Sequence, residues 1–216
     1  PLKATTQIYE YCVNSGLNTY CDDLIFDIRK ENNKFLIKTP KREITADIIV
    51  NCAGSWANNI AKFLNLPLNV KSVPQQMIVT EATKYELKLL IAHIGRHLTL
   101  KQAQNGNYII GGGWTAGYSN LTKHIHSKKD SFEGNTWIAK KVIPKLSNAN
   151  ILRSWAAMSV DVGGYPLLGE HPLMKNFYVV VSSNGYTLGP ILGKLVSDQI
   201  LYDKKDYNLF ETNRLN

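Results

Sequence analysis

The chain has 216 residues, of which 44% are hydrophobic and 19% are charged, and this composition indicates a globular protein with one large or two small cores. No run approaches the roughly 20 apolar residues that cross a bilayer, and no signal peptide is visible, so we expect no transmembrane segment. The net charge of +8 does not predict nucleic-acid binding, because the basic residues occur as scattered pairs with acidic residues nearby.

The first part of the chain reads as alternating helix and strand. A helix is predicted over residues 4–14, where Ile8 and Cys12 are i,i+4 neighbours, and Gly16 is a suitable stop. The continuous apolar run 48–52 is typical of a strand buried on both faces of a parallel sheet, and a helix should follow over residues 55–64. Shorter strands are predicted over residues 17–20, 24–29 and 34–39.

The middle of the chain has a different pattern, in which short strands are joined by turns. Residues 105–107 (NGN) form a hairpin-type turn, and a helix is expected near residues 136–146. Strands are predicted over residues 76–80, 98–102, 108–110 and 151–158. We therefore expect a mostly antiparallel sheet over residues 74–158.

The last part of the chain returns to the first pattern. A buried strand is predicted over residues 177–182 and a helix over residues 190–201, with Pro190 as its first residue because the missing N–H would have no helical partner there. The expected fold is therefore α/β (α+β). One α/β domain, residues 1–73 with residues 159–216, is interrupted by a second domain.

The two strand–turn–helix joints, residues 48–57 and 182–190, are the most informative features of the sequence. In each, a buried strand breaks at a glycine and runs into a helix, which leaves backbone N–H groups free at the helix start. Such starts attract anionic or electron-rich atoms, because the free donors and the helix dipole point the same way. The pair predicts one extended ligand held at two points, whereas either segment alone could be an ordinary joint.

A glycine-rich segment at residues 111–117 is similar to a dinucleotide-binding fingerprint, but its context argues against that role. A fingerprint opens an amphipathic helix, and residues 118–124 are polar and without helical period. We expect instead a strand end where a bulky group approaches the backbone. The chain therefore contains no pyrophosphate-binding loop.

The sequence offers few metal-binding or nucleophilic groups. Cys12, Cys21 and Cys52 follow no metal-ligand spacing, and their odd number favours reduced thiols and a cytoplasmic location. His93 and His97 are four residues apart and could form a metal pair on a helix, but no third ligand stands at a useful spacing. We predict no metal site.

The order of segments resembles the C-terminal part of the D-amino-acid oxidase-type FAD-dependent oxidoreductases, a group that includes glycine, sarcosine and opine oxidases. The resemblance runs nearly from end to end, and each motif is weak alone while the ordered set is specific. Its motifs are residues 16–28 (GLNTYCDDLIFDI), 47–56 (DIIVNCAGSW), 74–81 (PQQMIVTE), 109–113 (IIGGG), 153–156 (RSWA), 164–169 (GYPLLG) and 184–190 (NGYTLGP).

The resemblance implies an FAD cofactor and oxidation of a small amine or amino acid by hydride transfer to the flavin, which gives an imine. It places Ile25 beside the adenine and Gly54 along the adenosine and pyrophosphate. It also places the last glycine-rich turn against the flavin, where N–H groups would stabilise negative charge on the reduced ring. The implied cofactor-binding residues are Ile25, Ala53, Gly54, Trp56, Gly164, Asn184, Gly185, Tyr186, Thr187 and Leu188.

Three departures from the family pattern change the expectation. The N-terminal portion with the dinucleotide fingerprint is missing, so the chain is expected to be part of a longer enzyme or to need a partner subunit. The Asp usual before Gly164 is Gly163, and the Arg that holds a substrate carboxylate falls at Met158, which cannot pair with an anion. Lys101 and Arg153 are the alternative substrate-binding cations, with Arg96 as a further candidate. The competing interpretation is a non-catalytic binding or scaffold subunit that retains the fold without flavin.

Overall fold

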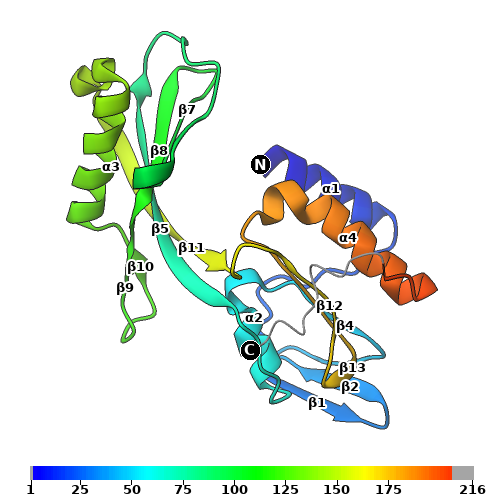
Figure 1. Ribbon diagram of the computed structural model, residues 1–216. Coiled ribbons are helices and arrows are strands. Elements are labelled where there is room, and N and C mark those ends of the chain that lie inside the picture. The colour runs from blue at the N-terminus through cyan, green and yellow to red at the C-terminus, as the bar shows by residue number, and fades with distance from the viewer. Residues whose placement is uncertain (1, 206–216) are drawn as a thin grey trace. The chain divides into compact units, whose positions relative to one another are not determined.

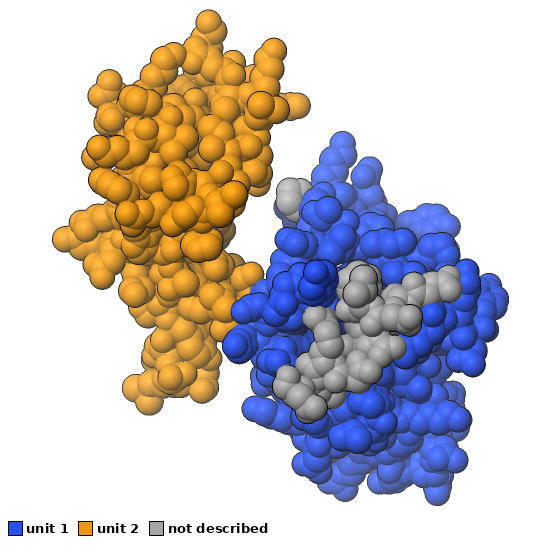
Figure 2. Space-filling model, in the orientation of Figure 1, with its two compact units in different colours: residues 1–71, 160–216 blue, residues 72–159 orange. Residues whose placement is uncertain are grey.

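The computed structural model describes residues 2–205 as a mixed α/β protein (Figure 1), so residues 206–216 of the last predicted segment lie outside the described residues. The chain divides into two compact units (Figure 2). Unit 1 consists of residues 1–71 with residues 160–216, and unit 2 consists of residues 72–159. The boundaries expected from the sequence were 73/74 and 158/159. No helix among the described residues is long and apolar enough to cross a membrane.

Unit 1 contains two three-stranded sheets that share a core. The strands of the first are β1 (Asp27–Glu31), β2 (Lys34–Lys38) and β3 (Glu43–Ala46), and they are antiparallel. The strands of the second are β12 (Leu167–His171), β13 (Met174–Val181) and β4 (Ile49–Asn51), in that order. Phe35 from the first sheet and Phe177 from the second are fully buried, with ring centroids 6.5 Å apart, so aromatic packing joins the two sheets.

The helices of unit 1 are α1 (Leu2–Asn14), the short η1 (Gly54–Trp56), α2 (Ala57–Lys62) and α4 (Gly185–Tyr202). Helix α2 follows β4 directly and buries Ala57 and Ala61 in the core. Helix α4 buries Leu192 and Val196, whereas α1 buries none of its residues. Unit 1 therefore has a well-packed centre and poorly covered outer helices.

Unit 2 is built on one five-stranded sheet with the order β11-β5-β8-β7-β6. Helix α3 (Lys129–Val142) lies along one face of this sheet (Figure 1), where Ile138 and Ala139 pack on Leu98, Leu100 and Ile110. The strands are β5 (Lys71–Ala82), β6 (Ile91–His93), β7 (Leu98–Gln102), β8 (Asn107–Thr115) and β11 (Ile151–Asp161). The remaining elements are η2 (Ile94–Arg96), η3 (Pro144–Asn148) and the hairpin of β9 (Gly117–Tyr118) and β10 (Ile125–His126).

Buried polar side chains fix the first half of α3 to this sheet. The Asn135 Oδ1 accepts from Gly113 N at 3.1 Å, and the Ser131 hydroxyl donates to the Trp114 carbonyl at 2.8 Å. The Gln76 Oε1 accepts from Lys128 N at 2.8 Å, immediately before the helix. These bonds satisfy groups that would otherwise be costly to bury, so they set the position of the helix along the sheet.

Several sequence predictions need correction. Residues 17–20 form no strand, the strand expected at 24–29 begins at Asp27, and strands β3, β6 and β12 were not predicted. The run 48–52 was expected to be buried on both faces, yet Val50 is 39% exposed within the described residues. Its parallel pairing, however, is confirmed, because β4 pairs with β13 in parallel.

Both long helices begin earlier than predicted. Helix α3 starts seven residues before position 136, because its first buried positions are polar and escape an apolar pattern. Helix α4 starts at Gly185, so the prediction that Pro190 opens the helix is wrong. Pro190 lies inside the helix, where it has no N–H to donate to the Tyr186 carbonyl.

Candidate cofactor site

Three of the predicted cofactor-binding segments meet at one edge of the second sheet of unit 1. Strands β13 and β4 are parallel, with Val179 opposite Asn51, so both strands end at the same edge. Strand β12 is antiparallel to β13, with Leu167 opposite Val181, so the loop before β12 lies at this edge too. Ligands of open α/β sheets bind outside the carboxyl ends of the parallel strands. We call this place the sheet edge.

The segment after β4 is held by a buried amide. Asn51 is 3% exposed, and its Nδ2 donates to the Ala57 carbonyl at 2.9 Å while its Oδ1 accepts from Ala53 N at 3.2 Å. Gly54 has φ +54°, and a Cβ at this position would meet no atom within 4 Å. The chain therefore presents bare backbone to open space at Gly54, beside the exposed ring of Trp56. Asn51 was not among the predicted site residues, and its only sequence signal is an amide in an apolar run.

Cys52 lies between Asn51 and Ala53, in the turn after β4. The residue is exposed as a whole, but neighbouring atoms displace water from the thiol and raise its pKa above the usual value. A raised pKa lowers the fraction of thiolate, which is the form of cysteine that attacks electrophiles.

The segment after β13 places a helix start at the sheet edge. Leu188 N donates to the Asn184 carbonyl at 3.0 Å, which is the first turn of α4, and Asn184 N donates to the Ser182 hydroxyl at 3.1 Å. The N–H groups of Gly185, Tyr186 and Thr187 precede the first helical bond and point out of the helix. A Cβ at Gly185 would meet no atom within 4 Å. The positive end of α4 thus faces open space.

The loop before β12 contains Gly164, which has φ +93° and open space where a Cβ would be. The preceding Gly163 has φ +73°, and its N–H donates to Asp161 Oδ1 at 2.9 Å. The family motif has an aspartate immediately before the glycine, and here an aspartate two residues earlier closes the turn. This loop therefore also offers uncovered backbone at the sheet edge.

Ile25 lies two residues before β1 and packs against the core of unit 1. Close to it in sequence, the Asp23 side chain is only 2% exposed and pairs with Arg42, with Nε to Oδ2 at 3.1 Å. Neither Asp23 oxygen is hydrogen-bonded within the described part of the chain. The Arg42 guanidinium lies 3.8 Å from the centre of the Tyr20 ring.

These observations fit an FAD molecule. The open glycines at positions 54, 164 and 185 leave room where a flat, extended ligand could approach the backbone, and the start of α4 offers donors for anionic atoms. Near Ile25, the buried Asp23 carboxylate is compensated by its ion pair with Arg42. The predicted cofactor residues thus belong to elements whose backbone is accessible, with Ile25 as the one residue that the sheet pairing does not bring to the edge.

The predicted substrate-binding residues all belong to unit 2, and they are described within that unit. Leu98 and Leu100 face α3, so Lys101 projects from the opposite, uncovered face, in a row with Ile109 and Val79. In β11, burial alternates from Arg153 to Met158, so these two side chains lie on opposite faces of the strand. The Arg153 guanidinium stacks on Trp155 at 5.3 Å, and that of Arg96 lies 5.6 Å from the Trp137 ring centre.

The glycine-rich segment 111–117 is strand and not a phosphate loop, as expected. Glycines 111 to 113 lie inside β8, and a Cβ on Gly112 would stand 1.9 Å from the His97 carbonyl oxygen. A Cβ on Gly113 would stand 2.4 Å from the Arg96 carbonyl oxygen, so close backbone packing requires these glycines. His93 and His97 share no helix, and the described residues contain no group of three potential metal ligands.

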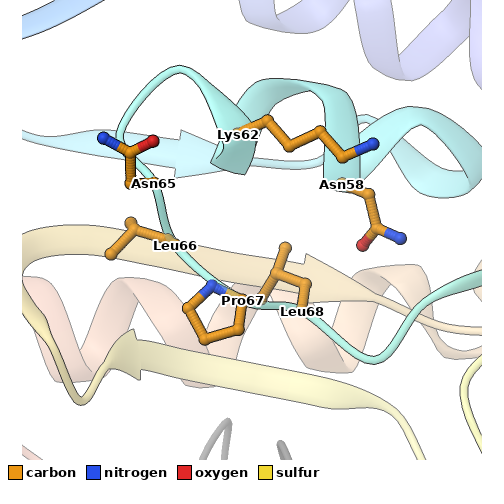
Figure 3. Close-up of a pocket in the computed structure, with 6 residues that line it drawn as sticks. All are labelled: Asn58, Lys62, Asn65, Leu66, Pro67 and Leu68. Atoms are coloured by element: carbon orange, nitrogen blue, oxygen red, sulfur yellow. The ribbon is translucent and has the colours of Figure 1, made fainter.

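A surface pocket of about 400 Å³ also lies in unit 1 (Figure 3). Lys62 and Asn58 line it from one face of α2, and the Lys62 side chain extends toward Asn58. The Asn58 amide nitrogen donates to the Val70 carbonyl at 2.7 Å. The other lining residues are Asn65, Leu66, Pro67 and Leu68. Lys62 is the one basic or acidic side chain among these lining residues.

Comparison with known proteins gives one consistent result. The family model described as "FAD dependent oxidoreductase" (DAO) matches residues 1–199. The chain is 25% identical over 184 residues to a glycine oxidase of Geobacillus kaustophilus, covering 82% of this chain and 46% of the relative. It is 27% identical to the mitochondrial dimethylglycine dehydrogenase of Rattus norvegicus over 203 residues, covering 81% of this chain and 23% of the relative.

Solved structures agree on the fold. The L-proline dehydrogenase from P. horikoshii superposes with a TM-score of 0.87 at 23% identity, covering 99% of this chain and 59% of that one. The glycine oxidase from Geobacillus kaustophilus superposes with a TM-score of 0.79 at 21% identity, covering 94% and 55%. The chain thus spans between a quarter and three fifths of these relatives.

Proposed function

The chain belongs to the DAO family of FAD-dependent oxidoreductases, and from this we propose that it forms the C-terminal portion of a flavoenzyme that oxidises an amine or an amino acid. The observation that carries the proposal is the meeting of three uncovered backbone segments at the sheet edge. The chemistry that FAD supplies when bound is acceptance of a hydride from the carbon beside the amine nitrogen, which leaves an imine. Relatives named glycine oxidase and dimethylglycine dehydrogenase support this reaction class.

Each segment of the sheet edge has its own proposed role. Ala53, Gly54 and Trp56 would bind the adenosine and pyrophosphate side, because Asn51 fixes their backbone in an open turn. The N–H groups from Gly185 to Thr187, with Asn184 and Leu188 beside them, would stabilise negative charge on the flavin. Gly164 would let the ring approach the loop before β12, and Ile25 would lie against the adenine.

We propose that further polypeptide completes the cofactor site, either an N-terminal portion of the same protein or a partner subunit. Helix α1 buries none of its 13 residues, and its apolar Ile8 and Tyr11 are 56% and 74% exposed. Exposed apolar surface on this scale marks a place where protein binds protein. The chain also covers only part of its relatives and contains no phosphate-binding loop. Unpaired Cys12, Cys21 and Cys52 support a reducing compartment such as the cytoplasm.

Lys101 is our proposed cation for a substrate carboxylate. It stands on the uncovered face of the unit 2 sheet among small and apolar neighbours, whereas Met158 is uncharged and Arg153 stacks on Trp155. In the complete enzyme, Lys101→Gln should weaken binding of a carboxylate inhibitor about tenfold, the loss of one charge-assisted contact. Arg153→Gln is the matched control and should leave that affinity unchanged. If Arg153→Gln weakened inhibitor binding and Lys101→Gln did not, Arg153 would be the residue that binds the carboxylate.

The central test is the colour of the complete protein. A purified sample should show flavin absorption that an amine or amino acid bleaches without oxygen. A correctly folded but colourless protein would support the alternative, a scaffold subunit that retains the fold without flavin. A coloured protein that no amine or amino acid bleaches would contradict the proposed substrate class alone.

A further inference from the structure

The positive charge of the chain is concentrated in unit 2. This unit holds 11 of the 25 Lys and Arg residues but only four of the 17 acidic residues, so it contributes seven of the eight net charges. Residues 87–129 contain no Asp or Glu at all, and they include four of the five histidines. Seen by unit, the basic residues are therefore less scattered than their order in the sequence suggested.

Part of this acid-free stretch forms the β9–β10 hairpin, which projects from the unit 2 sheet (Figure 1). Its loop is ordered by Ser119 N, which donates to the His124 carbonyl at 3.0 Å, and by Thr122 N, which donates to the Ser119 hydroxyl at 3.2 Å. Leu121 in this loop is 94% exposed, the highest value among the large hydrophobic side chains of the described residues. The hairpin thus presents an apolar tip on a fixed backbone.

Basic side chains run from this tip to the base of the hairpin, where Lys128 precedes α3. Lys123, His124, His126 and Lys128 are all exposed, and the two imidazoles stack with centroids 6.3 Å apart. Elsewhere in unit 2, Lys129 pairs with Glu133 and Lys145 with Glu86. Within residues 2–205, by contrast, Lys123 and Lys128 make no ion pair. Their charge is therefore available to an outside partner.

We propose that the β9–β10 hairpin docks on an anionic lipid bilayer. Leu121 would enter the boundary between headgroups and acyl chains, while Lys123 and Lys128 remain among the anionic headgroups. Each lysine near such a surface strengthens binding roughly fivefold. A bilayer is favoured over an acidic protein because a single protruding leucine needs no complementary pocket in a soft interface. The hairpin would hold the protein at the membrane surface without any segment that spans it.

The test is co-sedimentation of the complete protein, whose flavin content has been measured, with lipid vesicles. Vesicles of phosphatidylcholine and phosphatidylglycerol in equal amounts are compared with vesicles of phosphatidylcholine alone. The protein should bind only the anionic vesicles. The double variant Lys123→Glu/Lys128→Glu should lose binding about 20-fold or more. Lys140→Glu/Lys141→Glu, the same charge change on exposed residues of α3, should lose far less.

The leucine variants separate insertion from simple charge attraction. Leu121→Ser should weaken vesicle binding several-fold, whereas Leu89→Ser, at another exposed leucine of unit 2, should not. No binding to anionic vesicles, equal losses in both lysine pairs, or full binding by Leu121→Ser would each overturn the proposal. The first result would point to an acidic protein surface, and the last would point to simple charge attraction without insertion. Thermal melting of each variant checks that the fold is intact. Vesicle binding is measured without an enzyme assay, so the result does not depend on the proposed oxidase activity.

Discussion

Helices α1 and α3 have similar lengths, 13 and 14 residues, but opposite environments. Helix α3 buries four residues against its own sheet and is tied there by Asn135 and Ser131. Helix α1 presents Ile8 and Tyr11 to solvent and buries nothing. Helix α3 thus belongs to a finished core in unit 2, whereas unit 1 has a finished core and an unfinished outside at α1. The proposed cofactor site lies on the unfinished unit, so its function should depend on what covers it.

The largest expected effect is on FAD affinity. The 216-residue chain alone should bind FAD about 100-fold more weakly than the complete protein or more, because a phosphate loop and a ribose-binding acid each supply charge-assisted hydrogen bonds of about 1.5–3 kcal/mol. Fluorescence titration of both proteins measures the difference. Equal, tight binding would mean that unit 1 is complete after all.

A pair of alanine variants tests the contrast between the helices directly. Ile138→Ala in α3 should lower the free energy of unfolding by about 2–5 kcal/mol in any context, because it leaves a cavity in the unit 2 core. Ile8→Ala in α1 should cost less than about 0.5 kcal/mol in the chain alone. In the complete protein, Ile8→Ala should lower the free energy of unfolding by nearly as much as a substitution at a buried site. Denaturant unfolding gives both values, and an Ile8 effect that stays small there would show that α1 is uncovered.

Two glycine variants separate the cofactor site from backbone strain. Gly54→Val and Gly16→Val both place a side chain at positive φ in open space, so each should destabilise the fold by about 1–2 kcal/mol. In the complete protein, only Gly54→Val should weaken FAD, by about tenfold, through lost contact with one part of the ligand. Retained FAD affinity in Gly54→Val would remove this glycine from the proposed site.

The smallest expected effect is electronic. In the flavin-loaded enzyme, Gly185→Val should push the ring from the start of α4 and lower the flavin's reduction potential by about 30 mV, which corresponds to ~1.4 kcal/mol for a two-electron couple. Gly193→Val, two turns further along α4 and equally uncrowded, is the control and should leave the potential unchanged. An unchanged potential in both variants would make the α4 start a purely structural joint.

The sequence predicted those parts of the fold in which apolar residues carry the pattern. Strands β4 and β13 were predicted because both are short apolar runs, and the structure adds that they pair with each other in parallel. The first half of α3 was missed because its buried positions are Ser131 and Asn135, whose hydrogen bonds replace apolar contacts. The first turn of α4 was missed because Gly185 and Gly189 have low helix propensity.

The candidate site was predicted as ten residues, and its three glycines are the part that can be argued from the sequence alone. Open backbone at Gly54 and Gly164 follows from residue type and turn context, both of which the sequence contains. The amide of Asn51 could not be assigned a role, because its two hydrogen bonds exist only once the strand and helix are placed. The cofactor contacts themselves stay predictions.

The Asn51 amide has a consequence for the order in which the holoenzyme assembles. Since it already closes the turn between β4 and α2, this part of the site needs no ligand to take its shape. Binding of the cofactor at the turn after β4 therefore requires no local folding step. Its rate should follow the arrival of the covering polypeptide, so the reconstituted enzyme should gain flavin with the concentration dependence of an association between chains or domains.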